Sequence, residues 1–119
     1  METNFSEYQK ALLSLEKALA EPKSDIVRDA TIQRFEFCVE LAWKCAKKVM
    51  GTNSTAPKTV VREMAQNQLI NDVEFWLNAI DHRNLSSHTY KEALAEIVYQ
   101  FARDFLAKGQ DLLARLAKP

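Results

Sequence analysis

Only 2 glycines and 3 prolines occur among the 119 residues of this chain. An all-β domain needs many turns, and turns depend heavily on these two residue types. Their scarcity therefore predicts a few long helices joined by short connections. A chain of this length holds a single core of ordinary size, whereas two cores would each be too small to be stable. We expect one all-α domain over residues 1–119.

Apolar residues recur at the spacing of an α-helix in five segments, and no segment alternates with the period of two that is typical of a strand. The predicted helices cover residues 4–19, 25–50, 58–68, 71–85 and 89–116. Gly51 is expected to end the second helix. Gly109 lies inside the last helix, where glycine costs about 1 kcal/mol relative to alanine, and the pattern gives no reason for it. The predicted fold is an antiparallel bundle of four long helices plus one short helix.

Two of the predicted helices begin at residues with capping side chains. Asn71 and Glu74 resemble a capping pair that opens the fourth helix. Thr89 and Glu92 match a capping box, in which the two side chains bond reciprocally to backbone N–H groups at the helix start. We therefore expect the last helix to open at Thr89.

The charge is balanced, with 16 basic and 16 acidic residues. A free-standing nucleic-acid binder usually has a basic excess, so any nucleic-acid contact here must rely on a local patch or on a partner. No apolar run approaches the ~20 residues that span a bilayer, and the N-terminal sequence lacks a signal-peptide pattern, so we expect a cytoplasmic location and no membrane contact. Cys38 and Cys45 lie ~10 Å apart along one predicted helix, too far for a disulfide, and are interpreted as reduced core residues.

The apolar stripe of the fourth predicted helix becomes polar over its last turns. Val73, Leu77 and Ile80 begin the stripe, and the next positions on it hold Arg83, Asn84, Ser87 and His88. Buried charges and amides need partners, so this face is expected to open into a cleft, a second subunit or a ligand.

If the helix continues unbroken, Asn84 and His88 share one face and Arg83 points elsewhere. If it ends near Leu85, as the capping box at Thr89 favours, a short connection brings His88 back beside Arg83. His88 then lies just before a helix N-terminus, where backbone N–H groups favour an anion, and the pattern predicts a phosphate site. Two plainer interpretations remain. Arg83 near a helix C-terminus interacts favourably with the helix dipole, and this alone would explain its position without any function. His88 is equally consistent with a hydrogen-bonded structural residue.

Other residues near this stripe are weaker candidates. Asp81, His82 and His88 lack the supporting residues of a metal site, so we expect neither a metal nor a cofactor. Glu36, Glu40 and Lys44 share one helix face, for which solvation is the simplest interpretation. Carboxylates four residues apart repel unless a cation faces them, so Glu40 is a supporting candidate for the site. Arg34 would be that cation or would meet a partner, and Asp81 and His82 are further supporting candidates.

Two blocks of sequence resemble a known family. Arg83-Asn84-Leu85-Ser86-Ser87-His88-Thr89-Tyr90 is similar to the signature of the HEPN superfamily, extended here by a tyrosine two residues after the histidine. Residues 28–37 and 40–44 resemble the second helix of the nucleotidyltransferase substrate-binding-protein-like family within it. The resemblance covers nearly the whole chain, from about Phe5 to Leu116.

This resemblance implies a five-helix HEPN bundle, commonly a homodimer, that pairs with a minimal nucleotidyltransferase. It also implies one of two functions. The chain is the partner and substrate-binding subunit of that transferase in a two-component, toxin–antitoxin-like module. Alternatively, it is a metal-independent endoribonuclease toxin that the transferase neutralises by nucleotidylylation. The chain is not itself the transferase, because it has neither a Gly-rich phosphate loop nor an Asp-x-Asp motif.

The resemblance also implies a role for each residue of the signature. His88 would act as general acid or base on the ribose 2′-hydroxyl or on the leaving 5′-oxygen. Arg83 would stabilise charge on the phosphorane, and Asn84 would orient the other two residues. Tyr90 would be the acceptor that the transferase modifies. A plainer interpretation is that Tyr90 packs over Leu94 or donates a hydrogen bond. The implied partners are the transferase, a second copy of the chain, and RNA or a nucleotide.

Overall fold

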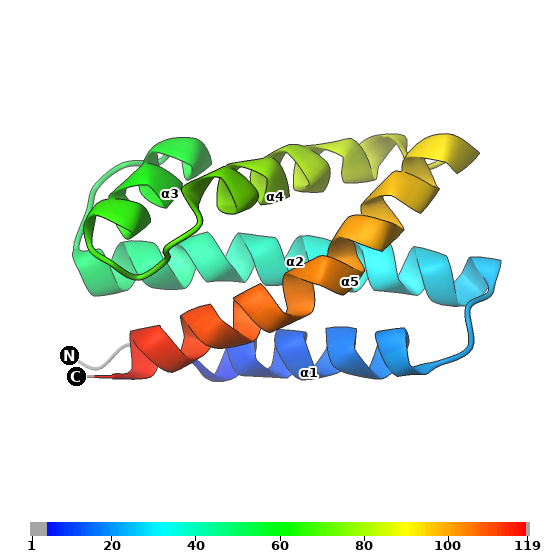
Figure 1. Cartoon of the computed structure of the whole chain (residues 1–119), viewed down its shortest axis with the longest axis horizontal. Helices are drawn as coiled ribbons and strands as arrows, with labels where there is room; N and C mark the ends of the chain where they lie inside the picture. Colours follow the sequence, from blue (N-terminus) through cyan, green and yellow to red (C-terminus); the bar gives the residue numbers. More distant parts are fainter. Residues whose placement is uncertain (1–4, 119) are drawn as a thin grey trace.

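The computed structural model describes residues 5–118, which form an antiparallel bundle (Figure 1). Its elements are α1 (Ser6–Ala20), α2 (Asp25–Met50), α3 (Pro57–Gln66), α4 (Val73–Leu85), the 3₁₀ turn η1 (Ser86–His88) and α5 (Glu92–Ala117). α1, α2 and α4 run side by side in alternating directions, and α5 crosses them obliquely on its way back (Figure 1). The predicted all-α bundle is confirmed. The predicted start of the first helix at residue 4 lies outside the described residues.

The second helix has the bounds that the sequence predicts. The Ser24 hydroxyl accepts a hydrogen bond from the Val27 amide at 3.1 Å and caps its N-terminus. Gly51 ends the helix in the left-handed conformation, with φ 70°. α2 contributes the longest row of buried residues to the core and therefore serves as the axis against which the other helices pack.

Both predicted capping signals are wrong. Asp72, not Asn71, caps α4 by accepting a hydrogen bond from the Phe75 amide at 3.2 Å. Thr89 does not open α5, because its hydroxyl instead donates to the Ser86 carbonyl at 3.0 Å. α5 begins at Glu92, whose carboxylate pairs with Arg28 on α2. A nearly buried guanidinium without a carboxylate partner is costly, whereas water can solvate the exposed amides of a helix start that lacks a cap. The pair between Glu92 and Arg28 is therefore favoured over the capping box.

The core is one cluster of buried side chains to which all five α-helices contribute. Phe105 of α5 lies near its centre, with edge-to-face contacts to Phe35 of α2 and Trp76 of α4, both at 5.3 Å between ring centroids. Cys38 and Cys45 are buried free thiols, as predicted, and burial raises the pKa of Cys38 to about 12. Within residues 5–118 no helix has both the length and the apolar character that crossing a membrane requires.

The structure explains the glycine inside α5. The Tyr8 hydroxyl of α1 donates a buried hydrogen bond of 2.8 Å to the Gly109 carbonyl. A Cβ atom on Gly109 would lie 2.8 Å from Leu12 Cδ2 and 2.9 Å from Phe105 Cε2. Glycine therefore permits the close approach of α1 and α5, and the contact offsets its poor helix propensity.

Candidate functional site

The polar end of α4 packs against α2. Arg83 follows Trp76 and Ile80 on the buried stripe of α4, and its Nη2 atom lies 2.9 Å from a Glu40 oxygen. The other Glu40 oxygen lies 3.5 Å from Lys44 Nζ, one turn along α2. Glu40 thus contacts Arg83 directly, and its supporting role stays a prediction. Its face of α2 is not simply solvated, because the cation that it requires comes from α4.

Part of the Arg83 guanidinium has no partner. Its Nε atom is buried and meets no hydrogen-bond acceptor within residues 5–118. Asn84 Oδ1 lies 3.5 Å from another guanidinium nitrogen, at the outer limit of a hydrogen bond. A small cavity of about 60 Å³ adjoins these groups and is lined by Glu40, Trp43, Pro57, Ile80, Arg83 and Asn84. Arg83 thus combines one firm ion pair with unused donor capacity, which is suited to an anionic ligand.

The turn after α4 is fixed to α2 by a serine. Ser86 Oγ lies 2.8 Å from Glu36 Oε2 and 2.6 Å from the Arg83 carbonyl, so its hydroxyl can donate to either oxygen. Thr89 adds the bond to the Ser86 carbonyl described above. The sequence singled out neither Ser86 nor its bond to Glu36. The sequence signal for this bond was the position of Glu36 on the same face of α2 as Glu40.

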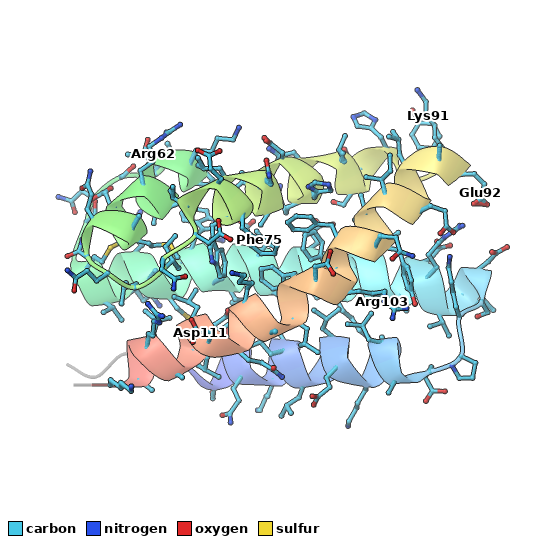
Figure 2. All side chains as sticks on the ribbon, in the orientation of Figure 1. Arg62, Phe75, Lys91, Glu92, Arg103 and Asp111 are labelled. Atoms are coloured by element: carbon cyan, nitrogen blue, oxygen red, sulfur yellow. The ribbon has the colours of Figure 1, made fainter. Side chains whose placement is uncertain are left out.

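His88 and Tyr90 are exposed on the connection between α4 and α5. Tyr90 is 79% exposed, and its ring lies 6.2 Å from the His88 ring, edge to face. Lys91 and Glu92 mark the end of the bundle where this connection leads into α5 (Figure 2). The predicted phosphate site at a helix N-terminus is wrong, because α5 begins four residues after His88. Within the described chain, His88 makes no hydrogen bond to Arg83, which faces Glu40 instead.

Three of the supporting candidates are held elsewhere. Asp81 forms an ion pair of 2.6 Å with Lys58 on α3. His82 stacks on Phe101 of α5 at 4.0 Å between ring centroids, and its Nδ1 lies 2.7 Å from the Asn78 carbonyl. Arg34 donates to the Ser14 carbonyl on α1 at 2.8 Å, so it is not the cation opposite Glu40. In the described part of the chain, no group of three His, Cys, Asp or Glu side chains is placed to hold a metal ion.

A cationic patch lies next to the site on α2. Lys44, Lys47 and Lys48 line a cavity of about 630 Å³ near the C-terminal end of this helix, together with Trp43 and Glu7. Lys44 also reaches the Glu40 carboxylate, so the patch continues from the Arg83 pair. Lysines in the last turn of a helix also complement its dipole. The patch is nevertheless a local concentration of positive charge. A chain with balanced charge would need such a patch to contact nucleic acid.

The sequence also matches known proteins. Residues 3–118 match the family described as nucleotidyltransferase substrate binding protein like. A Haemophilus influenzae protein named "Probable ribonuclease HepT" is 33% identical over 100 residues, which cover 77% of this chain and 68% of that protein.

Two solved structures share the fold. A crystal structure of a Thermus thermophilus protein matches with a TM-score of 0.86 and 33% identity, over 93% of this chain and 99% of that chain. A Haemophilus influenzae structure, described as revealing the fold of a substrate binding domain of a nucleotidyltransferase, matches with a TM-score of 0.85 and 30% identity. That match covers 97% of this chain and 100% of the other.

Proposed function

The chain belongs to the nucleotidyltransferase substrate-binding-protein-like family of the HEPN superfamily, and we propose that it is the partner and substrate-binding subunit of a minimal nucleotidyltransferase in a two-component, toxin–antitoxin-like module. One observation carries this proposal. Arg83 and His88 of the signature make no hydrogen bond to each other within the described chain, whereas Asn84, His88 and Tyr90 are exposed around one connection. Such a surface is available to a second protein.

Binding is tested with the transferase encoded beside this chain. We expect His88→Ala combined with Tyr90→Ala to weaken the complex at least about tenfold in isothermal titration calorimetry, since interface energy concentrates in a few aromatic and polar side chains. The matched control is Arg62→Ala, which removes an exposed side chain on α3 at the opposite end of the bundle (Figure 2). Equal affinities for the wild type and the double variant would contradict this surface.

Tyr90 is the proposed acceptor of the nucleotidyl group. The chain has 3 tyrosines, and Tyr8 and Tyr99 are 0% and 2% exposed, whereas Tyr90 is 79% exposed. In the proposed step, the Tyr90 phenol oxygen attacks the α-phosphorus of ATP, pyrophosphate leaves, and the phenol proton passes to solvent. The phosphodiester brings negative charge beside His88 and so would hinder the approach of another phosphate.

The acceptor role is tested by incubating the chain with its transferase, ATP and magnesium, followed by peptide mass mapping. We expect an adenylyl adduct on the peptide that holds Tyr90, and none on Tyr90→Phe. The peptides with Tyr8 and Tyr99 are internal controls, because both side chains are buried. An active transferase that leaves the Tyr90 peptide unmodified would refute the proposal.

The second candidate is a metal-independent endoribonuclease, favoured by the signature residues and by the name of the Haemophilus relative. His88 would take the proton from the ribose 2′-hydroxyl as its oxygen attacks phosphorus. The bond from phosphorus to the 5′-oxygen then breaks, leaving a 2′,3′-cyclic phosphate. The departing 5′-oxygen takes up a proton from water to become a hydroxyl, and His88 releases its proton to water. Arg83 would stabilise the phosphorane. Because Arg83 and His88 are not bonded to each other in one chain, the phosphate would bridge them, or a symmetric homodimer would set two signatures in one cleft.

Cleavage of RNA in the presence of EDTA separates the two candidates. If the chain is a nuclease, His88→Ala and Arg83→Ala abolish cleavage while Arg62→Ala does not. Light scattering should then report twice the mass of the chain, with loss of activity on dilution to the monomer. No cleavage by wild-type dimer would leave the binding subunit as the function.

A further inference from the structure

Arg28 is a cation in an unfavourable place. It lies in the first turn of α2, where the helix dipole disfavours positive charge. It is only 7% exposed, and it is the only charged side chain that is buried within residues 5–118. A charge that is both buried and opposed by the dipole is retained only if its partners compensate for both effects.

Those partners come largely from the start of α5. The Arg28 guanidinium forms ion pairs with Glu92 and with Glu96, the latter at 3.3 Å. On α2 itself it contacts Asp29 at 3.2 Å and Asp25 at 3.9 Å. Glu92 and Glu96 are four residues apart and therefore share one face of α5, so a single planar guanidinium can reach both. A carboxylate in the first turn of α5 also complements the dipole of that helix.

Glu96 is also held from the other side. Lys23, in the connection before α2, pairs with it and lies 4.9 Å above the Tyr99 ring of α5. The first turns of α5 are thus tied by charge to the start of α2 and to the connection that precedes it. Tyr90 comes two residues before this tied region.

The connection that carries Tyr90 is therefore fixed to α2 at two points. Ser86 meets Glu36 at one end, and Glu92 meets Arg28 at the other. Positions 28 and 36 are about 12 Å apart along α2, given a rise of 1.5 Å per residue. Between the two points Tyr90 is 79% exposed, and the one ring contact that it makes within the described residues is with the exposed His88.

We propose that Arg28 is a positioning residue, which fixes the first turn of α5 and thereby presents Tyr90 to the partner nucleotidyltransferase. The functional half of this inference rests on the proposed acceptor role of Tyr90. Arg28 touches neither the tyrosine nor a substrate. It acts through Glu92 and Glu96, which both contact its Nη1 atom, while its Nε atom contacts Asp29 on α2, so the guanidinium links the start of α5 to the start of α2. A lysine keeps the charge but has a single nitrogen, which cannot replace both the Nη1 contacts to the glutamates and the Nε contact to Asp29, so Arg28→Lys separates charge from geometry.

The first measurement is hydrogen exchange of the backbone amides, which reports local opening. In Arg28→Gln we expect exchange over residues 87–95 to accelerate by about tenfold, the size expected for loss of a charged hydrogen bond. Arg28→Lys should show a smaller acceleration in the same segment. If the Arg28 variants do not fold, Glu92→Gln tests the same ion pair, because it changes only the exposed partner of Arg28.

The matched control is Lys108→Gln, which breaks the 3.3 Å ion pair between α5 and Asp72 at the start of α4. It removes another cross-helix pair of α5 without touching the connection, so exchange over residues 87–95 should stay at the wild-type rate. Unchanged exchange in the Arg28 variants would overturn the inference. So would an equal acceleration in every helix, which a merely structural role predicts.

The second measurement is the kinetics of Tyr90 modification by the transferase. We expect Arg28→Lys to raise KM for this chain by about tenfold with kcat nearly unchanged, because a misplaced acceptor is bound less well but reacts normally once bound. Lys108→Gln should leave both constants unchanged. If wild-type Tyr90 is never modified, the acceptor role fails and the functional half fails with it, whereas the exchange data still decide whether Arg28 fixes the segment.

Discussion

α5 joins two regions of opposite character. Around Gly109 it packs so closely against α1 that a Cβ atom would have to displace the side chains of Leu12 and Phe105, in an apolar contact that includes one buried hydrogen bond. At its other end it follows the exposed connection 86–91, which is held by ion pairs and hydroxyl bonds. Among the described residues, the connection contributes no side chain to the core cluster. The closely packed contact and the proposed chemistry therefore lie at different ends of one helix.

This difference has a testable consequence. Substitutions near Gly109 should alter the free energy of unfolding and leave binding or modification intact at temperatures where the protein is folded. Substitutions in the connection should do the reverse. A region that affected both quantities equally would contradict the separation.

The largest expected effect is that of Gly109→Val. Its Cβ alone would meet Leu12 and Phe105 at less than 3 Å, so we expect a loss of about 2–3 kcal/mol in the free energy of unfolding from overpacking. Urea denaturation measures it. Ala107→Val is the matched control, since position 107 is exposed on the same helix and carries only the propensity cost of about 0.5 kcal/mol. Equal losses would show that the helix contact is not close.

Tyr8→Phe should cost less, about 1–2 kcal/mol. The substitution keeps the ring and removes the hydroxyl that donates to the Gly109 carbonyl, leaving a buried acceptor unpaired. Tyr99→Phe is its control, because the Tyr99 hydroxyl makes no hydrogen bond within the described residues. Thermal unfolding of the two variants gives the comparison. A Tyr8 variant as stable as the Tyr99 variant would argue against the buried bond.

The two regions also differ in how far the sequence predicts them. Helical periodicity and Gly51 predicted the bundle and the bounds of α2, because these signals are local. The polar end of the α4 stripe predicted that Arg83 needs a partner. Glu40 was a supporting candidate, but the cation expected opposite it was Arg34 rather than Arg83. The start of α5 was predicted wrongly. Glu92 pairs with a residue 64 positions away, and local patterns do not record such a contact. A cation in the first turn of α2 was the one available signal, since the dipole disfavours it there.

Within the polar region, the Arg83–Glu40 pair should contribute about 0.5–1 kcal/mol. Both side chains are about one-third exposed, so water screens their attraction. A double-mutant cycle with Arg83→Gln and Glu40→Gln measures the coupling by urea denaturation. Lys44 also contacts Glu40 and partly compensates in the Arg83 variant. A coupling above about 3 kcal/mol would make this pair part of the stability-determining region and erase the contrast with Gly109.

The ion pairs at the start of α5 should lose their effect in acid. The hydrogen bond from Lys23, with a further one from Arg28, lowers the pKa of Glu96 below its usual value. A carboxyl whose pKa is lower in the folded state contributes stability above its unfolded pKa, and this contribution is lost as the pH falls through the folded pKa. The melting temperature of Glu96→Gln should therefore lie below wild type at about pH 7 and approach it by about pH 3. Lys23, Arg28, Asp25, Asp29 and Glu92 face the same cluster, so the comparison must be made against wild type at each pH. A gap that stays constant with pH would exclude a contribution from this charge.

The smallest effects on stability are expected for His88→Ala and Tyr90→Phe. Both side chains are exposed, and their one ring contact is with each other. Each substitution should change the free energy of unfolding by less than about 0.5 kcal/mol. The same variants should abolish RNA cleavage in one case and modification in the other, if the proposed roles hold. A loss of stability well above this limit would show that the connection is packed more firmly than its exposure indicates, and any loss of activity in these variants would then have a structural explanation.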